Sequence, residues 1–558
     1  MNQGLYQGFS VNGAELLMKS LKDQGVEYIF GIVGREAEAL LFDEADIDFI
    51  LTRDERTAAI AAEVYGRLTG RAGVCYSTFG PGATNLMTGI ASAYLDRAPL
   101  VAVSAQVEAD EVHPSTHQCV DQVGMAYPIT KWSYEIERVS KIPDMVEKAF
   151  FIAETERPGP TYLSIPVDLL QKKSDLRNFQ IKKYNKNRSL EKKPGKEVFE
   201  KLYELLKNSR LPIAVIGNGV VRAGVTTLLE FFIEKYQVGV VSTYGGKGGI
   251  SSHHNLYLGT ISKYLDDLLQ YKIIDAIFSE ADLILAIGFD VAEGNKPEIW
   301  EVGKEKTVVR IDSIPNDVGK LFTHEFEVVG DLGEILKWLS KKSYNSEKRH
   351  RLDEIQGKIQ EKKDLLINRT EKTKIPLTPM KIVSTVRKVL GPRDILVSDV
   401  GIHKQFACLF YDAIHPKTFL CSNGLGCMGF GLPAAIGAKF ACPERDVVAI
   451  CGDGGFHSGS QDLETCARYK LPVVVIVMKD DSFGLIKHYQ LAGQGKINSS
   501  SVDFGNVDFV KLAKANGCLG YHIQSVDHLK DTLTQALDSD QPTVLEVPVK
   551  YDYSFKGK

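Results

Sequence analysis

The segment Cys451-Gly-Asp-Gly-Gly-Phe456 is the part of the sequence from which the fold is best predicted. The apolar run 447–450 precedes it and predicts a buried strand, and a helical segment follows over 460–468. A second apolar run, 471–478, then leads to Asp480. The glycines therefore stand in a turn from strand to helix, where exposed backbone N–H groups can bind phosphate.

Two carboxylates accompany this turn. Asp453 lies among the glycines, and Asp480 follows the next predicted strand. Because neighbouring strands of a parallel sheet end at the same edge, both side chains can reach one hard cation. A Gly-Asp-Gly triplet alone is more often a plain turn with a solvated carboxylate. The flanking strands, the helix and the second acid together favour a site for Mg²⁺ and a diphosphate.

The composition limits the class of protein. A chain of 558 residues exceeds a single core and predicts two to four domains. Its net charge of −4 gives no indication of a nucleic-acid or membrane partner. Residues 1–6 contain no signal segment, and no apolar run reaches 18 residues. The nine cysteines form no Cys-x-x-Cys pair and predict reduced, buried thiols, so we expect a cytoplasmic protein.

Strands and helices alternate in three segments of the chain, over 1–185, 197–345 and 376–558. A basic polar stretch near 186–196 and a charged helical stretch over 347–374 separate them. This alternation is typical of doubly wound parallel sheets. We therefore predict an α/β protein of three domains.

Two motifs of the first segment indicate its function. Thr52-Arg-Asp-Glu55 places an acid where a strand gives way to a helix, and Phe79-Gly-Pro-Gly-Ala-Thr-Asn85 forms a turn and a helix start. Each motif is weak alone, because acids are common at helix starts. Combined with the Gly-Asp-Gly turn, they resemble the thiamin diphosphate (ThDP) enzymes of the acetolactate synthase-like family over nearly the whole chain. That resemblance implies a pyrimidine-binding first domain, a central domain, and a third domain that binds diphosphate and Mg²⁺.

The resemblance assigns catalytic roles in the first domain. Glu55 would hold N1′ of the cofactor's pyrimidine ring. His117 and Gln118 would line the reacting carbonyl as proton donor and hydrogen-bond partner. By spacing alone, His117 and Gln118 are equally well explained as polar loop residues.

The resemblance also assigns the metal ligands. They would be the side chains of Asp453 and Asp480 and the backbone carbonyl of Ser482. Asp480 departs from the asparagine that is usual in the family, but it keeps an oxygen ligand and adds a negative charge. The basic Lys479 beside it is a second departure.

The third domain would supply the remaining cofactor contacts. The carbonyl of Gly426 would accept the 4′-amino hydrogen, and Met428 would support the bent cofactor from below. Without the neighbouring motifs, Met428 would be interpreted as a core residue at a helix start. The other expected contacts are Gly401, His403, Gly454 and Gly455.

The central segment carries an imperfect nucleotide-binding motif. Gly217-Asn-Gly219 follows a predicted strand, but the third glycine, Gly224, lies outside the expected spacing. We therefore interpret the loop as a structural turn. Flavin-binding acetolactate synthases carry a segment like Arg-Phe-Asp-Asp-Arg nearby, whereas residues 288–293 here read Gly-Phe-Asp-Val-Ala-Glu, without arginines. We expect ThDP and Mg²⁺ as cofactors and consider FAD unlikely.

Several stretches resemble the carboxyethylarginine synthases most closely, namely 31–37, 116–119, 452–458 and 546–552. Their pocket residues correspond to Tyr264, Asp290 and Tyr551, and Lys404-Gln405 stands where they carry Arg-His. This implies a transferase that joins glyceraldehyde 3-phosphate to an amino acid amine with elimination of phosphate. Replacing arginine by lysine loses the bidentate fork for phosphate or carboxylate, so the substrate can differ.

The main alternative is an acetolactate synthase-like carboligase that decarboxylates pyruvate or another 2-oxo acid, which His403 and Met428 favour. A flavin enzyme of the pyruvate oxidase type is a third possibility. A non-catalytic ThDP-binding protein is a fourth, against which the intact Glu55 argues. In every case we expect small-molecule substrates, and a homodimer or homotetramer with ThDP at the subunit interface.

Overall fold

The structure is a computed structural model that describes residues 10–38, 40, 42, 46–155, 157–175, 194–262, 277–293, 300, 306–316, 324–344, 350–368 and 374–551. The described residues form two compact units. The first comprises the chain up to residue 175 together with Ile436–Pro443, and the second comprises the remainder. Among the described residues, no helix is both long and apolar enough to cross a membrane.

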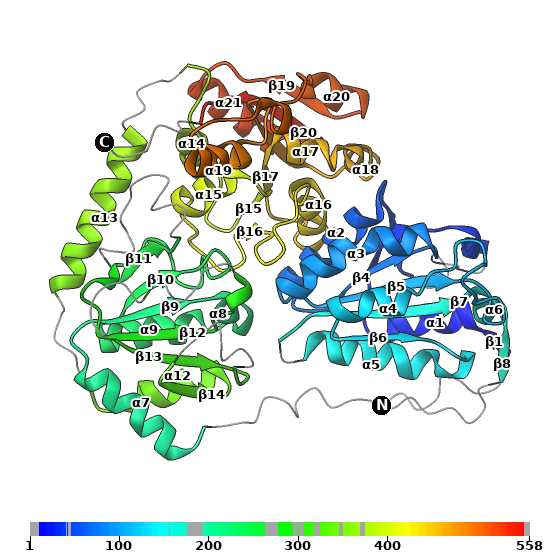
Figure 1. The fold of residues 1–558 in the computed structure, drawn as a ribbon, viewed down its shortest axis with the longest axis horizontal. Coiled ribbons are helices and arrows are strands. Elements are labelled where there is room, and N and C mark those ends of the chain that lie inside the picture. Colours follow the sequence, from blue (N-terminus) through cyan, green and yellow to red (C-terminus); the bar gives the residue numbers. More distant parts are fainter. Residues whose placement is uncertain are drawn as a thin grey trace. The chain divides into compact units, whose positions relative to one another are not determined.

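The first unit contains a six-stranded parallel sheet (Figure 1). Its strands, in spatial order, are β3 (Asp48–Leu51), β2 (Tyr28–Ile32), β4 (Gly73–Ser77), β5 (Leu100–Gln106), β7 (Pro160–Pro166) and β6 (Trp132–Glu135). Every residue of β4, β5 and β7 is buried, as expected for central parallel strands that are covered on both faces. The longer helices are α1 (Gly13–Asp23), α2 (Glu55–Thr69), α3 (Pro81–Leu95) and α5 (Ile142–Glu154).

Short elements complete this unit. Strand β1 (Ser10–Asn12) pairs antiparallel with β8 (Lys173–Asp175). Helix α4 (Gln122–Ala126) precedes β6, and helix α6 (Val167–Gln171) follows β7. Figure 1 shows α2 and α3 over one face of the sheet, and α1 and α5 over the other.

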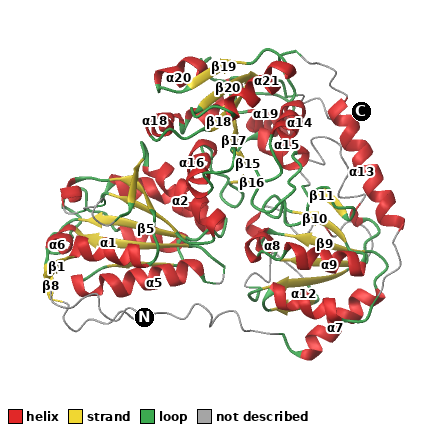
Figure 2. Cartoon of the chain, turned by 180° about the vertical axis from the view of Figure 1, so that it is seen from behind, coloured by secondary structure: helices red, strands yellow, loops and turns green. Residues whose placement is uncertain are grey.

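The second unit contains two further six-stranded parallel sheets, each flanked by helices (Figure 2). The central one runs β11 (Tyr257–Thr260), β10 (Gly239–Ser242), β9 (Pro212–Ile216), β12 (Leu283–Ile287), β13 (Thr307–Asp312) and β14 (Phe326–Val329). Its helices are α7 (Lys196–Asn208), α8 (Asn218–Ala223), α9 (Thr226–Tyr236) and α12 (Leu332–Lys341), and the long helix α13 (His350–Asn368) follows.

The C-terminal sheet carries the Gly-Asp-Gly turn. Its spatial order is β16 (Phe419–Cys421), β15 (Ile395–Ser398), β17 (Val447–Gly452), β18 (Val473–Lys479), β20 (Thr543–Pro548) and β19 (Leu519–His522). Its helices are α14 (Pro379–Val389), α15 (Ile402–Phe410), α16 (Gly431–Ala441), α17 (Asp453–His457), α18 (Leu463–Arg468), α19 (Gly484–Gln494), α20 (Phe509–Ala515) and α21 (Val526–Leu537).

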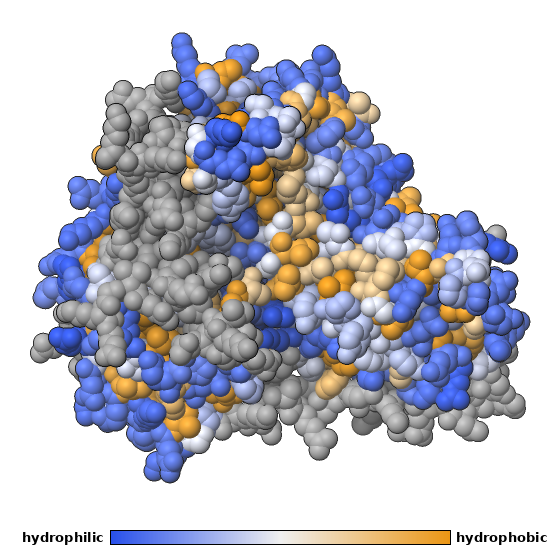
Figure 3. Space-filling model, in the orientation of Figure 1, coloured by the Kyte–Doolittle hydropathy of each residue, from blue (hydrophilic) through white to orange (hydrophobic). Residues whose placement is uncertain are grey.

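The predicted α/β class with three parallel sheets is confirmed. The strands predicted on either side of the Gly-Asp-Gly turn are β17 and β18. The predicted helix over 460–468 begins as a 3-10 turn and becomes α18, while the glycines themselves form the short helix α17. Figure 3 shows that hydrophilic side chains dominate the coloured surface, with apolar ones in smaller groups.

Two helix glycines allow a test of the packing. In α2, a Cβ at Gly66 would lie 2.2 Å from the carbonyl oxygen of Pro99, whereas a Cβ at Gly357 in α13 would meet nothing within 4 Å. We expect Gly66→Ala to lower the unfolding midpoint, because overpacking costs about 1–3 kcal/mol. Gly357→Ala should leave it unchanged or raise it, because alanine favours a helix by about 1 kcal/mol. Differential scanning calorimetry of both variants checks this, and equal shifts would contradict it.

Candidate functional site

The side chain of Asp453 joins the ends of two neighbouring strands. It follows β17 and is buried. Its Oδ1 accepts a hydrogen bond from the backbone N–H of Gly454 at 2.8 Å. Its Oδ2 accepts from the N–H groups of Asp480 and Asp481, at 2.9 and 2.6 Å. Because Asp480 directly follows β18, these bonds bring the two predicted metal-binding carboxylates together.

The second carboxylate, that of Asp480, is half-buried beside a buried serine. Ser482 is buried, and its hydroxyl donates to Oδ2 of Asp480 at 2.7 Å. Burial raises the pKa of Asp480 to about 7, and the charge of Asp453 acts in the same direction. Burial also raises the pKa of Asp453. A divalent cation between the two carboxylates would relieve this unfavourable burial of like charge, so the pair fits Mg²⁺.

The turn after Asp453 requires glycine for packing. A Cβ at Gly454 would lie 2.6 Å from the ring of Phe483, and one at Gly455 would lie 2.7 Å from Oδ2 of Asp399. No larger residue fits either position without movement of a neighbour. The turn can therefore present only its backbone to a ligand, as a phosphate-binding turn does.

Asp399 connects this turn to the glycine-rich loop, residues 422–430. It follows β15 and is fully buried. Its Oδ1 accepts from the N–H groups of Val400 at 2.6 Å and Phe430 at 3.1 Å. Burial raises the pKa of Asp399 to about 6. We did not predict this residue, although an acid directly after an apolar strand, in Ser-Asp-Val-Gly, was a usable signal.

His403 offers a buried polar atom beside the same turn. Its Nε2 is buried and has no hydrogen-bond partner in the structure. A Cβ at Gly452 would lie 3.1 Å from its Nδ1, and a Cβ at Gly401 would lie 2.7 Å from its Cε1. Burial lowers the pKa of His403 to about 3, and the charge of Lys404 adds to this, so the ring is neutral. An unpaired nitrogen at this position fits a ligand held against the Gly452–Asp453 turn.

The glycine-rich loop holds Met428 at the surface of the unit. Gly426 and Gly429 adopt φ values of +70° and +78°, which favour glycine. Met428 is 38% exposed, so its alternative interpretation as a core residue is wrong. A Cβ at Gly429 would lie 3.5 Å from the carbonyl oxygen of Gly455, which places the loop beside α17.

Three of the predicted pocket residues gather around α15. Lys404 donates from Nζ to the carbonyl oxygen of Ser422 at 3.0 Å. Oε1 of Gln405 accepts from the hydroxyl of Tyr244, a residue of the central domain, at 2.5 Å. Tyr551 is buried, with its ring 6.2 Å from that of Phe406.

The other two predicted pocket residues, Tyr264 and Asp290, are not placed at α15 by the structure. Tyr264 lies outside the described residues. Asp290 follows β12, and its Oδ1 accepts from the N–H of Ala292 at 3.0 Å. Its backbone N–H donates to Glu293 at 3.3 Å, so Asp290 belongs to the surroundings of Glu293.

In the first unit, Glu55 begins α2 after an N-cap by Asp54. Its side chain is buried, and Oε2 accepts from Nδ2 of Asn85 at 3.0 Å. A Cβ at Gly82 would lie 3.2 Å from Oε1 of Glu55, so the second glycine of the Gly-Pro-Gly motif allows this approach. The motif itself contained Asn85, but its contact with Glu55 was not predicted.

The same motif approaches the predicted catalytic loop. A Cβ at Gly80 would lie 2.7 Å from the carbonyl oxygen of Gln118, and both residues have positive φ, +60° and +59°. His117 and Gln118 are both exposed. The structure thus places Gln118 against the turn that leads to Asn85 and Glu55, with His117 next to it.

The nucleotide-like loop of the central domain binds the chain's own carboxylate. Glu293 is buried, and its Oε1 accepts from the N–H of Asn218 at 2.9 Å. Its Oε2 accepts from the hydroxyl of Thr243. Cβ atoms at Gly217 and Gly245 would lie 2.6 and 2.7 Å from this carboxylate. The loop acts as a structural turn, because Glu293 stands where a phosphate would approach it.

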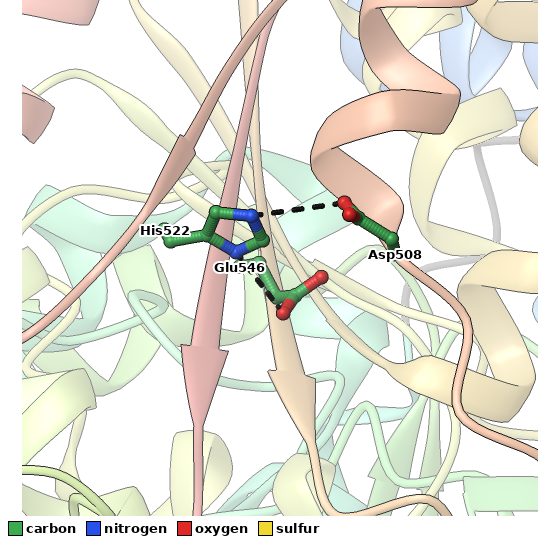
Figure 4. Close-up of side chains that lie close together, drawn as sticks. All are labelled: Asp508, His522 and Glu546. Atoms are coloured by element: carbon green, nitrogen blue, oxygen red, sulfur yellow. Dashed lines mark hydrogen bonds and ion pairs between the residues drawn. The ribbon is translucent and has the colours of Figure 1, made fainter.

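A cluster of Asp508, His522 and Glu546 meets the spacing of a metal site (Figure 4). His522 uses different nitrogens, however: Nδ1 lies 3.3 Å from Glu546 and Nε2 lies 3.7 Å from Asp508. Lys479 lies 3.6 Å from Glu546, and Lys511 lies 3.1 Å from Asp508. With cations already at both carboxylates, the cluster is better explained as an ion-pair network. Lys479 is the last residue of β18, so its ion pair with Glu546 connects this network to the strand end that precedes Asp480.

Comparisons with known proteins match this organisation. Residues 11–125, 199–339 and 399–547 match the N-terminal TPP binding, central and C-terminal TPP binding domains of thiamine pyrophosphate enzymes.

Relatives align over nearly the whole chain. A probable acetolactate synthase large subunit of Methanocaldococcus jannaschii is 34% identical over 97% of this chain and 92% of its own length. Acetolactate synthase of Bacillus subtilis is 30% identical over 97% of the chain and 93% of its length. The acetolactate synthase isozyme 3 large subunit of Escherichia coli is 32% identical over 95% of the chain and 92% of its length. The predicted resemblance to ThDP enzymes of the acetolactate synthase-like family is confirmed, while closeness to carboxyethylarginine synthase stays a prediction.

The metal site can be tested by ligand binding. We expect Asp453→Ala and Asp480→Ala each to weaken ThDP binding in the presence of Mg²⁺ by about tenfold or more, because each removes an oxygen ligand. Asp480→Asn should be milder, since an amide oxygen remains. Isothermal titration calorimetry measures the affinities. Glu361→Ala, at an exposed position of α13, is the control and should bind normally; unchanged binding by Asp453→Ala would contradict the assignment.

Glu293 predicts a dependence of stability on pH. Burial raises the pKa of Glu293 to about 7, from about 4.3 in an unfolded chain. Below both values the carboxyl is neutral in either state. As pH rises between them, the unfolded state releases its proton first, so the fold loses up to roughly 4 kcal/mol.

Glu293→Gln removes this titration, and its amide oxygen can still accept from Asn218. The unfolding midpoint of the variant relative to the parent should therefore increase from pH 5 to pH 8, as measured by calorimetry. Glu361→Gln, on an exposed position of α13, should show no such trend. A difference for Glu293→Gln that is constant with pH would contradict the prediction.

Proposed function

Because the chain belongs to the thiamine pyrophosphate enzyme family, we propose that it is a ThDP- and Mg²⁺-dependent carboligase acting on pyruvate or another 2-oxo acid. The carboxyl group would leave as CO₂, and the remaining fragment would join a second carbonyl compound. The observation that carries this proposal is the pair of buried Asp453 and half-buried Asp480 at adjacent strand ends, in a chain whose full-length relatives are named acetolactate synthases. The carboligase, the alternative in the sequence analysis, thus becomes the leading hypothesis.

The residues of the second unit would hold the cofactor. Asp453, Asp480 and the carbonyl of Ser482 would bind Mg²⁺, and the turn of Gly454 and Gly455 would bind the diphosphate. The remaining contacts would come from Gly401 and His403, from the carbonyl of Gly426 and from the Met428 side chain.

The residues of the first unit would handle protons. The bound cofactor supplies a carbon nucleophile for the substrate carbonyl. Glu55 would hold the pyrimidine nitrogen and exchange a proton with it, and Asn85 fixes the carboxylate of Glu55 by its hydrogen bond. His117 would donate a proton to the substrate oxygen, with Gln118 as a hydrogen-bond partner.

A homodimer or homotetramer is part of the proposal. Exposed large apolar residues occur on the glycine-rich loop and on the segment containing α19, namely Leu425, Met428, Phe483, Ile486 and Tyr489. Cofactor and a second subunit would cover them. The reaction as proposed uses no flavin, which is supported by Glu293 at the nucleotide-like loop.

One observation favours a second candidate, a carboxyethylarginine synthase-like enzyme that eliminates phosphate from glyceraldehyde 3-phosphate. The ammonium group of Lys404 is buried beside the glycine-rich loop and contacts a neutral carbonyl oxygen. A phosphate would be a suitable counter-charge for it.

The two candidates differ in their products. We expect the protein with ThDP and Mg²⁺ to release CO₂ from pyruvate and form acetolactate, and to show no flavin absorption band. Glu55→Gln should lower turnover by about 10²–10⁴-fold, because it removes the proton-exchanging group. The exposed variant Glu108→Gln is the control.

Normal turnover by Glu55→Gln would contradict the assigned role of Glu55. Phosphate release from glyceraldehyde 3-phosphate, without CO₂ release from pyruvate, would replace the carboligase by the second candidate.

A further inference from the structure

We propose that Lys247 and Lys404 together bind an anionic group of the substrate that is remote from its reacting carbonyl. The group would be a phosphate ester or a second carboxylate. We call these two residues the two-lysine site. The inference deepens the proposed function, on which it rests, because it defines the class of carbonyl compound that the enzyme accepts.

Both lysines are buried beyond what is usual for this residue type. Lys247 is 3% exposed and Lys404 is 7% exposed. The ammonium of Lys247 donates to the hydroxyl of Thr260 at 3.0 Å, and that of Lys404 donates to the carbonyl of Ser422 at 3.0 Å. Both acceptors are neutral. Burying a charge without a counter-charge is unfavourable, so two such residues at one place call for an explanation.

The two ammonium groups lie near the same sulfur atom. Burial raises the pKa of the Cys408 thiol well above its ordinary value, and a hydrogen bond with Cys421 adds to this, while the charges of Lys404 and Lys247 both act in the opposite direction. Both lysines are therefore within electrostatic reach of Cys408. Because the thiol stays protonated, it does not supply their counter-charge.

The nearby carboxylate is also committed elsewhere. Glu293 accepts from Thr243 and Asn218, and the charges that act on it are those of Asp290 and Arg222. Within the described ranges, neither lysine forms an ion pair with a carboxylate. The positive charge of the two-lysine site is thus unneutralised by any part of the chain that the structure describes.

Neutral hydrogen-bonding groups connect the two lysines. The Tyr244 hydroxyl donates to Oε1 of Gln405 at 2.5 Å, and its oxygen lies 2.6 Å from the hydroxyl of Ser262, from which it can accept. The ammonium of Lys404 lies 5.8 Å from the centre of the Tyr244 ring. Ser262 follows Thr260, the partner of Lys247, by two residues. Two ammonium groups with hydroxyl and amide groups between them can together bind an oxyanion such as a phosphate or a carboxylate.

The position of the two-lysine site relates it to substrate. Lys404 follows His403, which lies against Gly452, and its acceptor Ser422 begins the glycine-rich loop that carries Met428. The proposed diphosphate turn is formed by other residues, Gly454 and Gly455. An anion at the two-lysine site would therefore be additional to the cofactor, and a substrate with one carboxylate at its reacting end would leave it unfilled.

Anion binding tests this without any turnover. The protein is first saturated with ThDP and Mg²⁺, so that the diphosphate site is filled. Inorganic phosphate and, separately, succinate are then added, with chloride at equal ionic strength as reference. We expect phosphate, succinate or both to raise the unfolding midpoint as a specific ligand does. Phosphate alone would identify a phosphate ester, and succinate alone a second carboxylate.

Variants locate the effect. Lys247→Gln and Lys404→Gln remove the charge but keep a hydrogen-bond donor, and each should lower the affinity for the effective anion by at least about tenfold. Lys363→Met is the control, because this lysine is paired with Asp412 at 2.6 Å. The proposal would be overturned if neither anion raised the unfolding midpoint more than chloride does, or if both lysine variants kept the full increase. Failure of the carboligase assay would not affect this readout, so the two hypotheses fail separately.

Discussion

The candidate cofactor site depends on a single carboxylate, that of Asp453, accepting the backbone N–H groups of Asp480 and Asp481. These bonds fix the ends of β17 and β18 against each other beyond their sheet pairing, and so set the separation of the two carboxylates. They also hold the backbone of Asp480 and Asp481, the two residues that follow β18, at this sheet edge. The hydroxyl of Ser482 and the ion pairs of Lys479 act on the same strand end from its other sides.

A second constraint is the amount of buried charge in this unit of the chain. Asp399, Asp453 and Asp480 are acids whose pKa is raised by burial, and Lys247 and Lys404 are buried with neutral acceptors. Folding alone gains little from such an arrangement, since each charge loses its hydration. Sites that bind charged ligands are where this loss is useful, because the ligand supplies the missing charge. The acidic group thus suits a cation, and the two-lysine site suits an anion.

The fold was largely predictable from the sequence, but only part of the site was. Apolar runs of strand length with glycine turns gave the three parallel sheets, and a shared sheet edge placed Asp453 near Asp480. The contact of Asn85 with Glu55 depends on how closely α2 and α3 pack, which no local pattern specifies. Glu293 was also missed, because a carboxylate that fills a glycine loop from 75 residues away has no sequence signature. Met428 is exposed and so does not belong to the core, while its role under the cofactor stays a prediction.

The residues proposed to hold the cofactor and those proposed to contact the substrate are separate in this chain. The Gly-Asp-Gly turn and the Glu55 group lie within segments that match general domains of the family, so they specify a cofactor without specifying a reaction. Around α15, by contrast, Lys404 and Gln405 contact Ser422 and Tyr244, which come from two different domains. A change at this junction would alter charge at the proposed substrate site and leave the proposed metal ligands untouched. The substrate can therefore differ while the residues proposed to hold the cofactor stay the same.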